Sequence, residues 1–92
     1  MPINGSLENS ILRPLLRLDG VEEVHFRKDP DFLRIWVIIN RPDDGVENTI
    51  YTEYLKALDH AGECETDLCV LFRMDREIGL IAPQGAQAAT AV

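Results

Sequence analysis

Cysteine is scarce in this sequence, and its two cysteines, Cys64 and Cys69, do not form a recognisable site. Their C-x-x-x-x-C spacing differs from the C-x-x-C of redox and zinc sites, and no second ligand pair is present to complete a tetrahedral zinc centre. On one extended strand, residues five apart point to opposite faces, which disfavours a disulfide between them. We therefore expect two free thiols and no cofactor.

Long apolar runs are also absent. No stretch approaches the roughly 20 residues that a membrane-spanning helix needs. The opening residues, MPINGSLENS, have neither the basic start nor the apolar core of a secretory signal. These absences predict a cytoplasmic protein with no membrane association, and 92 residues suit a single domain.

Positive charge is in short supply. Nine Lys and Arg against 16 Asp and Glu leave a net charge of −7, and the basic residues are scattered among acids. Binding to a phosphate backbone needs a basic stripe. We therefore expect that nucleic acid is not the main partner.

Catalytic motifs are missing as well: the sequence has no glycine-rich phosphate loop, no G-x-S-x-G and no dinucleotide fingerprint. His25 lies on a predicted strand between Glu23 and Arg27, with no nucleophile in the pattern around it. His60 lies near the end of a predicted helix, where a protonated imidazole interacts favourably with the helix dipole. The sequence favours a protein that is not an enzyme.

The most strongly β-prone stretch is residues 33–40, LRIWVIIN. Its odd positions are uniformly aliphatic, whereas its even positions are Arg34, Trp36, Ile38 and Asn40. This alternation predicts a strand with one face in a dry core and one mixed face.

Apolar residues at helical spacing predict helices over residues 7–18 and 46–58. Pro14 indicates that the first helix either kinks there or begins near Ser10, with the proline in its first turn. Asp44 and Glu47 fit a capping box at the start of the second helix. Its predicted apolar stripe is Val46, Ile50, Tyr51, Tyr54, Leu55 and Leu58.

Two further strands are predicted over residues 21–27 and 65–73, which gives the order α-β-β-α-β. A tight turn joins the first two strands as an antiparallel hairpin, and a right-handed crossover makes the second and third parallel. We predict an α/β domain of the α+β sandwich kind: a three-stranded mixed sheet of order 1-2-3 with both helices on one face. The single domain covers residues 1–81, and residues 82–92 are predicted to be a flexible tail rich in Ala and Gln.

The face away from the helices is left without a cover. Apolar side chains form its centre, and charged ones surround it. We expect this face to be an interface with a second copy of the chain or another protein, and the expected contact residues are Trp36, Ile38, Cys69, Leu71, Arg34, Arg27, Arg73 and His25. The alternative is that residues 74–81, predicted as a short edge strand or a docked turn, or the tail, fold over it.

Asp29 and Asp31 form a D-x-D pair that, with Asp67, provides three oxygen ligands for a divalent metal. D-P-D is also a good turn sequence. A metal site on these residues, or a small apolar ligand stacked on Trp36, is the alternative function.

From residue 11 to residue 77 the chain resembles a degenerate nucleotidyltransferase-like domain. A helix leads into GVEEVHF, an acidic pair precedes the aliphatic strand, and a helix bearing VENTIYTEYLKAL precedes ETDLCVLF. The resemblance implies that Asp29, Asp31 and Asp67 match that family's magnesium ligands, with the first two set one or two positions early. The family's phosphate-holding Gly-Ser motif has no counterpart, since HFRK stands in its place.

A second stretch, ILRPLLRLDGVEEVHF, is similar to the opening helix and strand of the C-terminal domain of iron–sulfur scaffold proteins. That family has the same α-β-β-α-β order and carries a C-x-x-C at the start of its second helix. The sequence here reads RPDD at that place, so the resemblance implies the fold without cluster binding.

Overall fold

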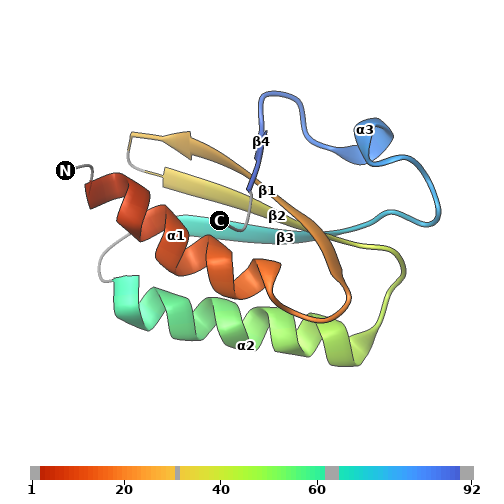
Figure 1. The fold of residues 1–92 in the computed structure, drawn as a ribbon, viewed down its shortest axis with the longest axis horizontal. Coiled ribbons are helices and arrows are strands. Elements are labelled where there is room, and N and C mark those ends of the chain that lie inside the picture. The colour runs from red at the N-terminus through yellow and green to blue at the C-terminus, as the bar shows by residue number, and fades with distance from the viewer. Residues whose placement is uncertain (1–2, 31, 62–64, 90–92) are drawn as a thin grey trace.

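The computed structural model describes residues 3–30, 32–61 and 65–89, with side chains for residues 10–30, 32–59 and 65–89 (Figure 1). The elements follow in the order α1 (Ile3–Leu16), β1 (Val21–Asp29), β2 (Phe32–Ile39), α2 (Asp44–Ala61), β3 (Thr66–Phe72), α3 (Ile78–Ile81) and β4 (Gln87–Ala88). The protein therefore has the α+β class that its sequence predicts. No helix of the described residues is long and apolar enough to cross a membrane.

The sheet has four strands in the order β3-β2-β1-β4. The hairpin of β1 and β2 is antiparallel, and the crossover through α2 makes β3 parallel to β2. The three-stranded prediction was wrong in one detail, because β4 pairs antiparallel with β1 through the register His25–Ala88 and Phe26–Gln87. This added strand lies within residues 82–92, which the sequence predicts as a tail.

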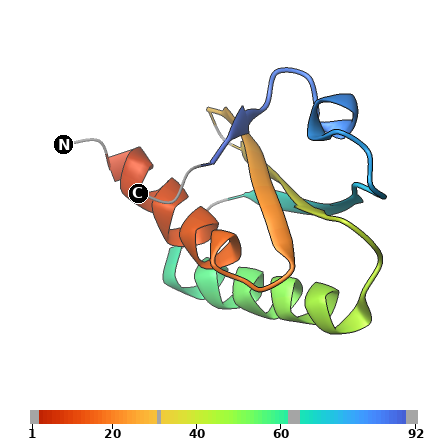
Figure 2. The ribbon, with the colours of Figure 1, turned by 45° about the vertical axis from the view of Figure 1, so that its right-hand side comes forward.

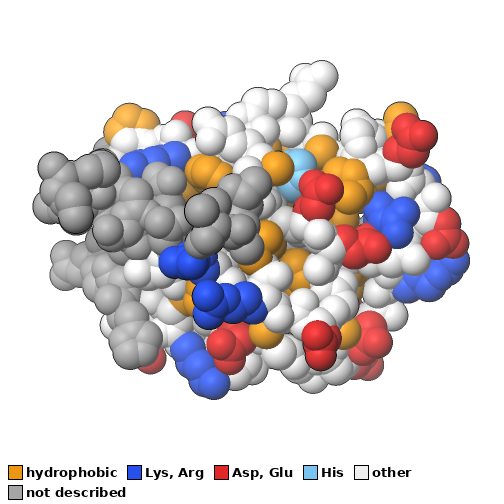
Figure 3. Space-filling view, in the orientation of Figure 1, with side chains coloured by type: hydrophobic (Ala, Val, Ile, Leu, Met, Phe, Trp, Pro, Cys, Tyr) orange, Lys and Arg blue, Asp and Glu red, His pale blue; other side chains and the backbone are white. Residues whose placement is uncertain are grey.

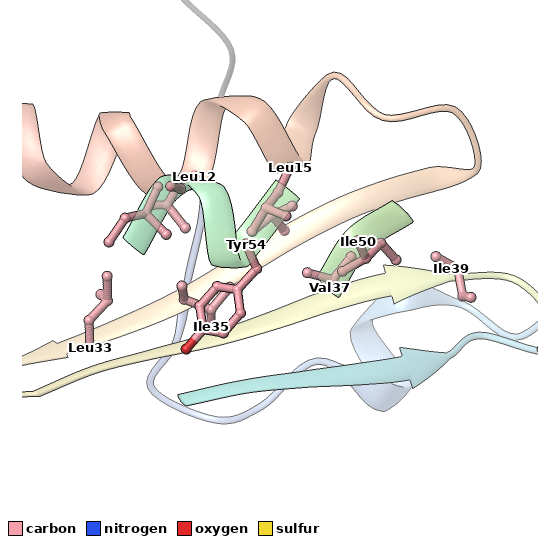
Figure 4. Packing of buried hydrophobic residues seen from close by; sticks show 11 residues of the cluster. Leu12, Leu15, Leu33, Ile35, Val37, Ile39, Ile50 and Tyr54 are labelled. Atoms are coloured by element: carbon pink, nitrogen blue, oxygen red, sulfur yellow. The ribbon is translucent and has the colours of Figure 1, made fainter. Parts of the chain in front are cut away.

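The core lies between the sheet and the two long helices, which cover the same face (Figures 1 and 2). The first helix contributes Ile11, Leu12 and Leu15, and the second contributes Ile50 and Tyr54. They meet alternate residues of β2, the strand at the centre of the packing in Figure 4: Leu33, Ile35, Val37 and Ile39, none more than 3% exposed. Burying each such side chain stabilises the fold by about 1.5–3 kcal/mol.

Helix α1 begins at Ile3, earlier than either start that the sequence predicts, and Pro14 lies in its last turn. The helix ends two residues later, and Gly20 then turns the chain into β1 with a φ of +90°. Pro14 has no amide hydrogen to donate to the carbonyl four residues earlier and its ring crowds that carbonyl, so the helix loses one hydrogen bond shortly before it ends.

A β-bulge near the start of β1 decides which side chains reach each face. Val21 pairs with Ile39, but the next pair is Glu23 with Ile38, so β1 carries one extra residue. Because of the bulge, Val21 and Val24, three apart, both pack against the core. Glu22 is left exposed at the sheet's end.

The cap of α2 lies one residue earlier than the sequence predicts. Asp43, not Asp44, accepts a hydrogen bond from the Val46 amide at 3.2 Å. The Asp43 amide in turn donates to the Glu47 carboxylate at 3.2 Å. Asp44 is therefore the first residue of the helix, where its charge complements the helix dipole.

Candidate interaction surface

We call the side of the sheet away from α1 and α2 the outer face. The segment after β3, which includes α3 and leads to β4, lies on that side of the sheet (Figure 2). The registers of β1, β2 and β3 place seven of the eight predicted interface residues on this face within the strands: Arg27, His25, Arg34, Trp36, Ile38, Cys69 and Leu71. The eighth, Arg73, follows directly after β3.

Two of these residues are covered within the chain, which corrects the expectation that they are open to a partner. Ile38 is 0% exposed and lies between Glu23 of β1 and Leu71 of β3. His25 is 8% exposed, lies opposite Ala88 of β4, and shares a hydrogen bond of 2.7 Å with the Glu23 carboxylate. The segment after β3 lies on this side of the sheet, and its strand β4 pairs with β1 beside His25 (Figure 2).

The outer-face residues of β2 and β3 other than Ile38 stay at least partly accessible. Trp36 and Leu71 are half-buried, and Cys69, the neighbour of Trp36 in the parallel register, is exposed with a free thiol. We call these three residues the outer strip. Cys64, the other predicted free thiol, lies outside the described residues.

Charged residues border the outer strip toward the hairpin end of the sheet. Arg34 and Arg27 are both exposed and lie opposite each other on β2 and β1, while Asp67 of β3 lies on the other side of Arg34. The Arg34 guanidinium carbon is 5.5 Å from the centre of the Phe32 ring, a cation–π distance. On the described surface in Figure 3, Lys and Arg are interspersed with Asp and Glu and do not form a basic stripe.

Arg73 is engaged within the chain. Its Nε and Nη2 donate to the two Glu22 carboxylate oxygens at 2.6 and 2.8 Å. This hydrogen bonding lowers the pKa of Glu22 and raises that of Arg73. Since the pKa of Glu22 is lowered in the folded chain, the pair stabilises the fold above the ordinary carboxyl pKa and loses that effect as pH falls through the folded value. The two residues line a shallow hollow of about 410 Å³ together with Asp75, Arg76, Glu77 and Ile78.

A tight turn after β3 is fixed by the end of β2. Met74 and Asp75 have φ values of 52° and 64°, in the left-handed region that side chains other than glycine rarely adopt. Asn40 holds the turn, because its side chain accepts from the Asp75 amide at 2.7 Å and donates to the Asp75 carboxylate at 2.9 Å. The Asn40 hydrogen bond, and then the charge of Arg41, lower the pKa of Asp75. Asp75 is therefore paired with both Asn40 and Arg41, and these contacts tie the turn after β3 to the end of β2.

The metal alternative lacks a gathered site in the described residues. Asp29 lies at the end of β1 opposite Phe32, with its carboxylate 3.9 Å from Arg27, whereas Asp67 lies on β3 opposite Arg34. Asp31 lies outside the described residues. Where side chains are described, no three His, Cys, Asp or Glu residues gather closely enough to hold a metal ion.

Sequence reasoning placed the third strand at an edge of the sheet but did not identify that edge as a candidate contact surface. β3 is the last strand of the order β3-β2-β1-β4, so within the described residues no strand pairs with its second edge. It is seven residues long, and Asp67 is its one charged residue. A long apolar edge of this kind is what proteins usually shorten, charge or cover. The predicted order 1-2-3 already placed this strand at an edge, and its low charge was the signal.

The outward flank of α2 is also more apolar than expected of a solvated helix. Tyr51 and Leu55, which the sequence assigns to the buried stripe, are 44% and 61% exposed. They lie one turn apart, next to Tyr54 and Leu58 on the helix surface. The Tyr54 hydroxyl is hydrogen-bonded to Thr66 at the start of β3, so this flank of α2 faces the β3 side of the sheet.

In comparisons with known proteins, no protein-family model, no curated protein and no solved structure matches the chain. The resemblances to nucleotidyltransferase-like domains and to iron–sulfur scaffold domains therefore stay predictions. The outer strip and the β3 edge are the features of the described residues that point to a function.

Proposed function

We propose that this protein is a small non-catalytic domain that self-associates through the β2–β3 side of its sheet, with Trp36 as the aromatic anchor. The observation that carries the proposal is the uneven cover of the outer face. Ile38 and His25 on this face are buried, whereas Cys69, next to Trp36, is exposed. A half-buried aromatic residue with an apolar surround and a charged border is how interfaces are commonly built.

The bordering charges fit this role. Arg34, Arg27 and Asp67 are exposed around the strip, and Arg73 ends it at the other side. Charges at the border of an interface set orientation and association rate more than affinity. Because closed two-fold dimers are the commonest oligomers, a second copy of the chain is the partner that the proposal favours.

Replacing the anchor tests the proposal. We expect Trp36→Ala to raise the dissociation constant of the assembly by about 30-fold or more, which corresponds to the roughly 2 kcal/mol of a hot-spot residue. The measurement is sedimentation velocity over a dilution series, with the melting transition recorded to show that the variant is folded.

Leu80→Ala is the matched control. Leu80 is 74% exposed on α3, outside the outer strip, so its loss should leave association unchanged. If Trp36→Ala and wild type gave the same dilution profile, Trp36 would not be the anchor.

A further inference from the structure

The backbone of β3 has a fixed set of groups directed at its free edge. The Glu65 carbonyl accepts from the Leu33 amide at 3.0 Å, and the Arg73 amide donates to the Ile39 carbonyl at 2.7 Å, so odd-numbered residues bond to β2. Along a strand the bonding direction alternates with each residue. The amides and carbonyls of Thr66, Leu68, Val70 and Phe72 therefore point away from the sheet, toward the free edge.

Side chains beside this edge are incompletely covered. In β2 the core-facing Ile35, Val37 and Ile39 are at most 2% exposed, whereas their neighbours Leu68, Val70 and Phe72 in β3 are half-buried. The flank of α2 that carries the exposed Tyr51 and Leu55 lies toward the β3 side of the sheet, where Tyr54 is hydrogen-bonded to Thr66. The edge strand and the helix flank are both partly exposed. A partner that presents a strand next to a helix would cover both at once.

We propose that the β3 edge pairs antiparallel with β3 of a second copy of the chain, about a two-fold axis that passes beside Cys69. This inference rests only on the self-association proposed above. Pairing at the β3 edge places Trp36 one strand behind the seam, so it is a different geometry from packing through the outer strip, and the Trp36→Ala result separates the two. Pairing around Cys69 aligns the whole strand, since Thr66 then lies opposite Phe72 and Leu68 opposite Val70 of the second copy. A two-fold axis beside Leu68 or Val70 would also direct the free amides and carbonyls of β3 at the partner strand, but it would leave part of β3 unpaired.

Charge supports a second copy as the occupant. In the register centred on Cys69, Glu65 lies opposite Arg73 of the second copy, and Asp67 lies opposite Leu71 and diagonal to the same arginine. The acidic residues of the two copies therefore do not lie opposite each other, which avoids like-charge repulsion across the strands, and Arg73 lies beside them while staying paired with Glu22 of its own chain. Both helix flanks with Tyr51 and Leu55 come to the same side of the joined sheet, next to each other.

The two Cys69 thiols provide the test. In the proposed ladder Cys69 and Cys69 of the second copy form a non-hydrogen-bonded pair. The Cα atoms of such a pair are about 4.5 Å apart, which is within the range of a disulfide. In a Cys64→Ser background, diamide as oxidant should link two chains through Cys69. The matched control is the variant Asp67→Cys with Cys69→Ser, which places the thiol two residues earlier on the same face of the same strand. Residues 67 of the two copies are roughly 13 Å or more apart in this register.

We expect the Cys69 chain to cross-link at least about tenfold faster than the Asp67→Cys chain, because paired thiols meet at an effective concentration far above that of the free protein. Equal rates in a protein that is dimeric by sedimentation would overturn the β3 pairing and leave self-association standing. A protein that is monomeric at every concentration would overturn both proposals.

The helix flank gives a second, independent readout. We expect Leu55→Arg to weaken dimerisation by tenfold or more, because the two flanks would bring like charges together in a contact between copies. Leu80→Arg changes a more exposed leucine on α3 and should leave dimerisation unaltered. Equal dissociation constants for the two variants would contradict the joined-sheet arrangement.

Discussion

Gly20 shows how one residue fixes the relation between α1, β1 and α2. Its φ of +90° suits glycine, and a Cβ placed there would lie 3.0 Å from Cγ2 of Val46 in the first turn of α2. Gly20 in the turn after α1 therefore lies so close to Val46 in α2 that a side chain at position 20 would crowd it. The sequence indicates a turn at Asp19-Gly20, but the contact with Val46 comes from the packing of segments that are distant in the sequence.

Gly20→Ala should destabilise the fold by about 1–3 kcal/mol, since it combines a disfavoured backbone region with a close contact. Urea denaturation measures the change. Gly79→Ala is the control, because a Cβ at Gly79 in α3 meets no atom within 4 Å. We expect the control to change stability by less than about 0.5 kcal/mol. An equal loss in both variants would mean that the Gly20 contact is not what the substitution removes.

The periodicity of apolar residues predicts the exposure of some side chains of β2 and α2 and not of others. The alternation of residues 33–40 correctly assigns the core-facing side chains of β2. It does not assign Ile38, which lies on the mixed face of the alternation and is nevertheless 0% exposed. On α2, the helical stripe includes Tyr51 and Leu55, yet both are exposed, because the width of a buried stripe is decided by what packs against it.

At the scale of elements, α2 depends on its first turn. The Asp43 carboxylate accepts a hydrogen bond from the Val46 amide in the first turn, and the Asp43 amide donates to the Glu47 carboxylate. Sequence reasoning chose Asp44 because it stands three residues before Glu47, the usual spacing of a capping box. Here the acidic residue lies four positions after the cap and still reaches back to it.

The two aspartates separate these alternatives. We expect Asp43→Ala to lower the free energy of unfolding by about 1 kcal/mol through loss of the cap. Asp44→Ala removes only a charge in the first turn, for which about 0.3–0.5 kcal/mol is expected. Chemical denaturation at low ionic strength measures both. A larger loss for Asp44→Ala would return the cap to the position that the sequence suggests.

Element boundaries in the sheet were less predictable than element types. The hairpin and the crossover follow from local patterns: a D-P-D turn between two alternating stretches, and a helix between two strands. The bulge in β1 leaves Val21 and Val24 three apart, which breaks a period of two without any glycine to mark it. The two-residue strand β4 is too short to produce a pattern, so the sequence could not distinguish it from a tail.

At the scale of the whole molecule, one face of the sheet is fully used by the fold and the other only in part. Helices α1 and α2 close the core face, while the segment after β3 runs along the outer side of the sheet (Figure 2). The accessible low-charge features are the outer strip, the β3 edge and the exposed flank of α2. An acidic chain with a net charge of −7 keeps copies apart in general, so association needs a surface of low charge such as these features provide.

The molar mass of the unmodified protein in solution tests self-association most directly. Light scattering coupled to size-exclusion chromatography, over a range of loading concentrations, gives the mass without assuming a shape. We predict a mass that rises with concentration from that of one 10.4 kDa chain toward twice that value. A mass of 10.4 kDa at every concentration would contradict the account.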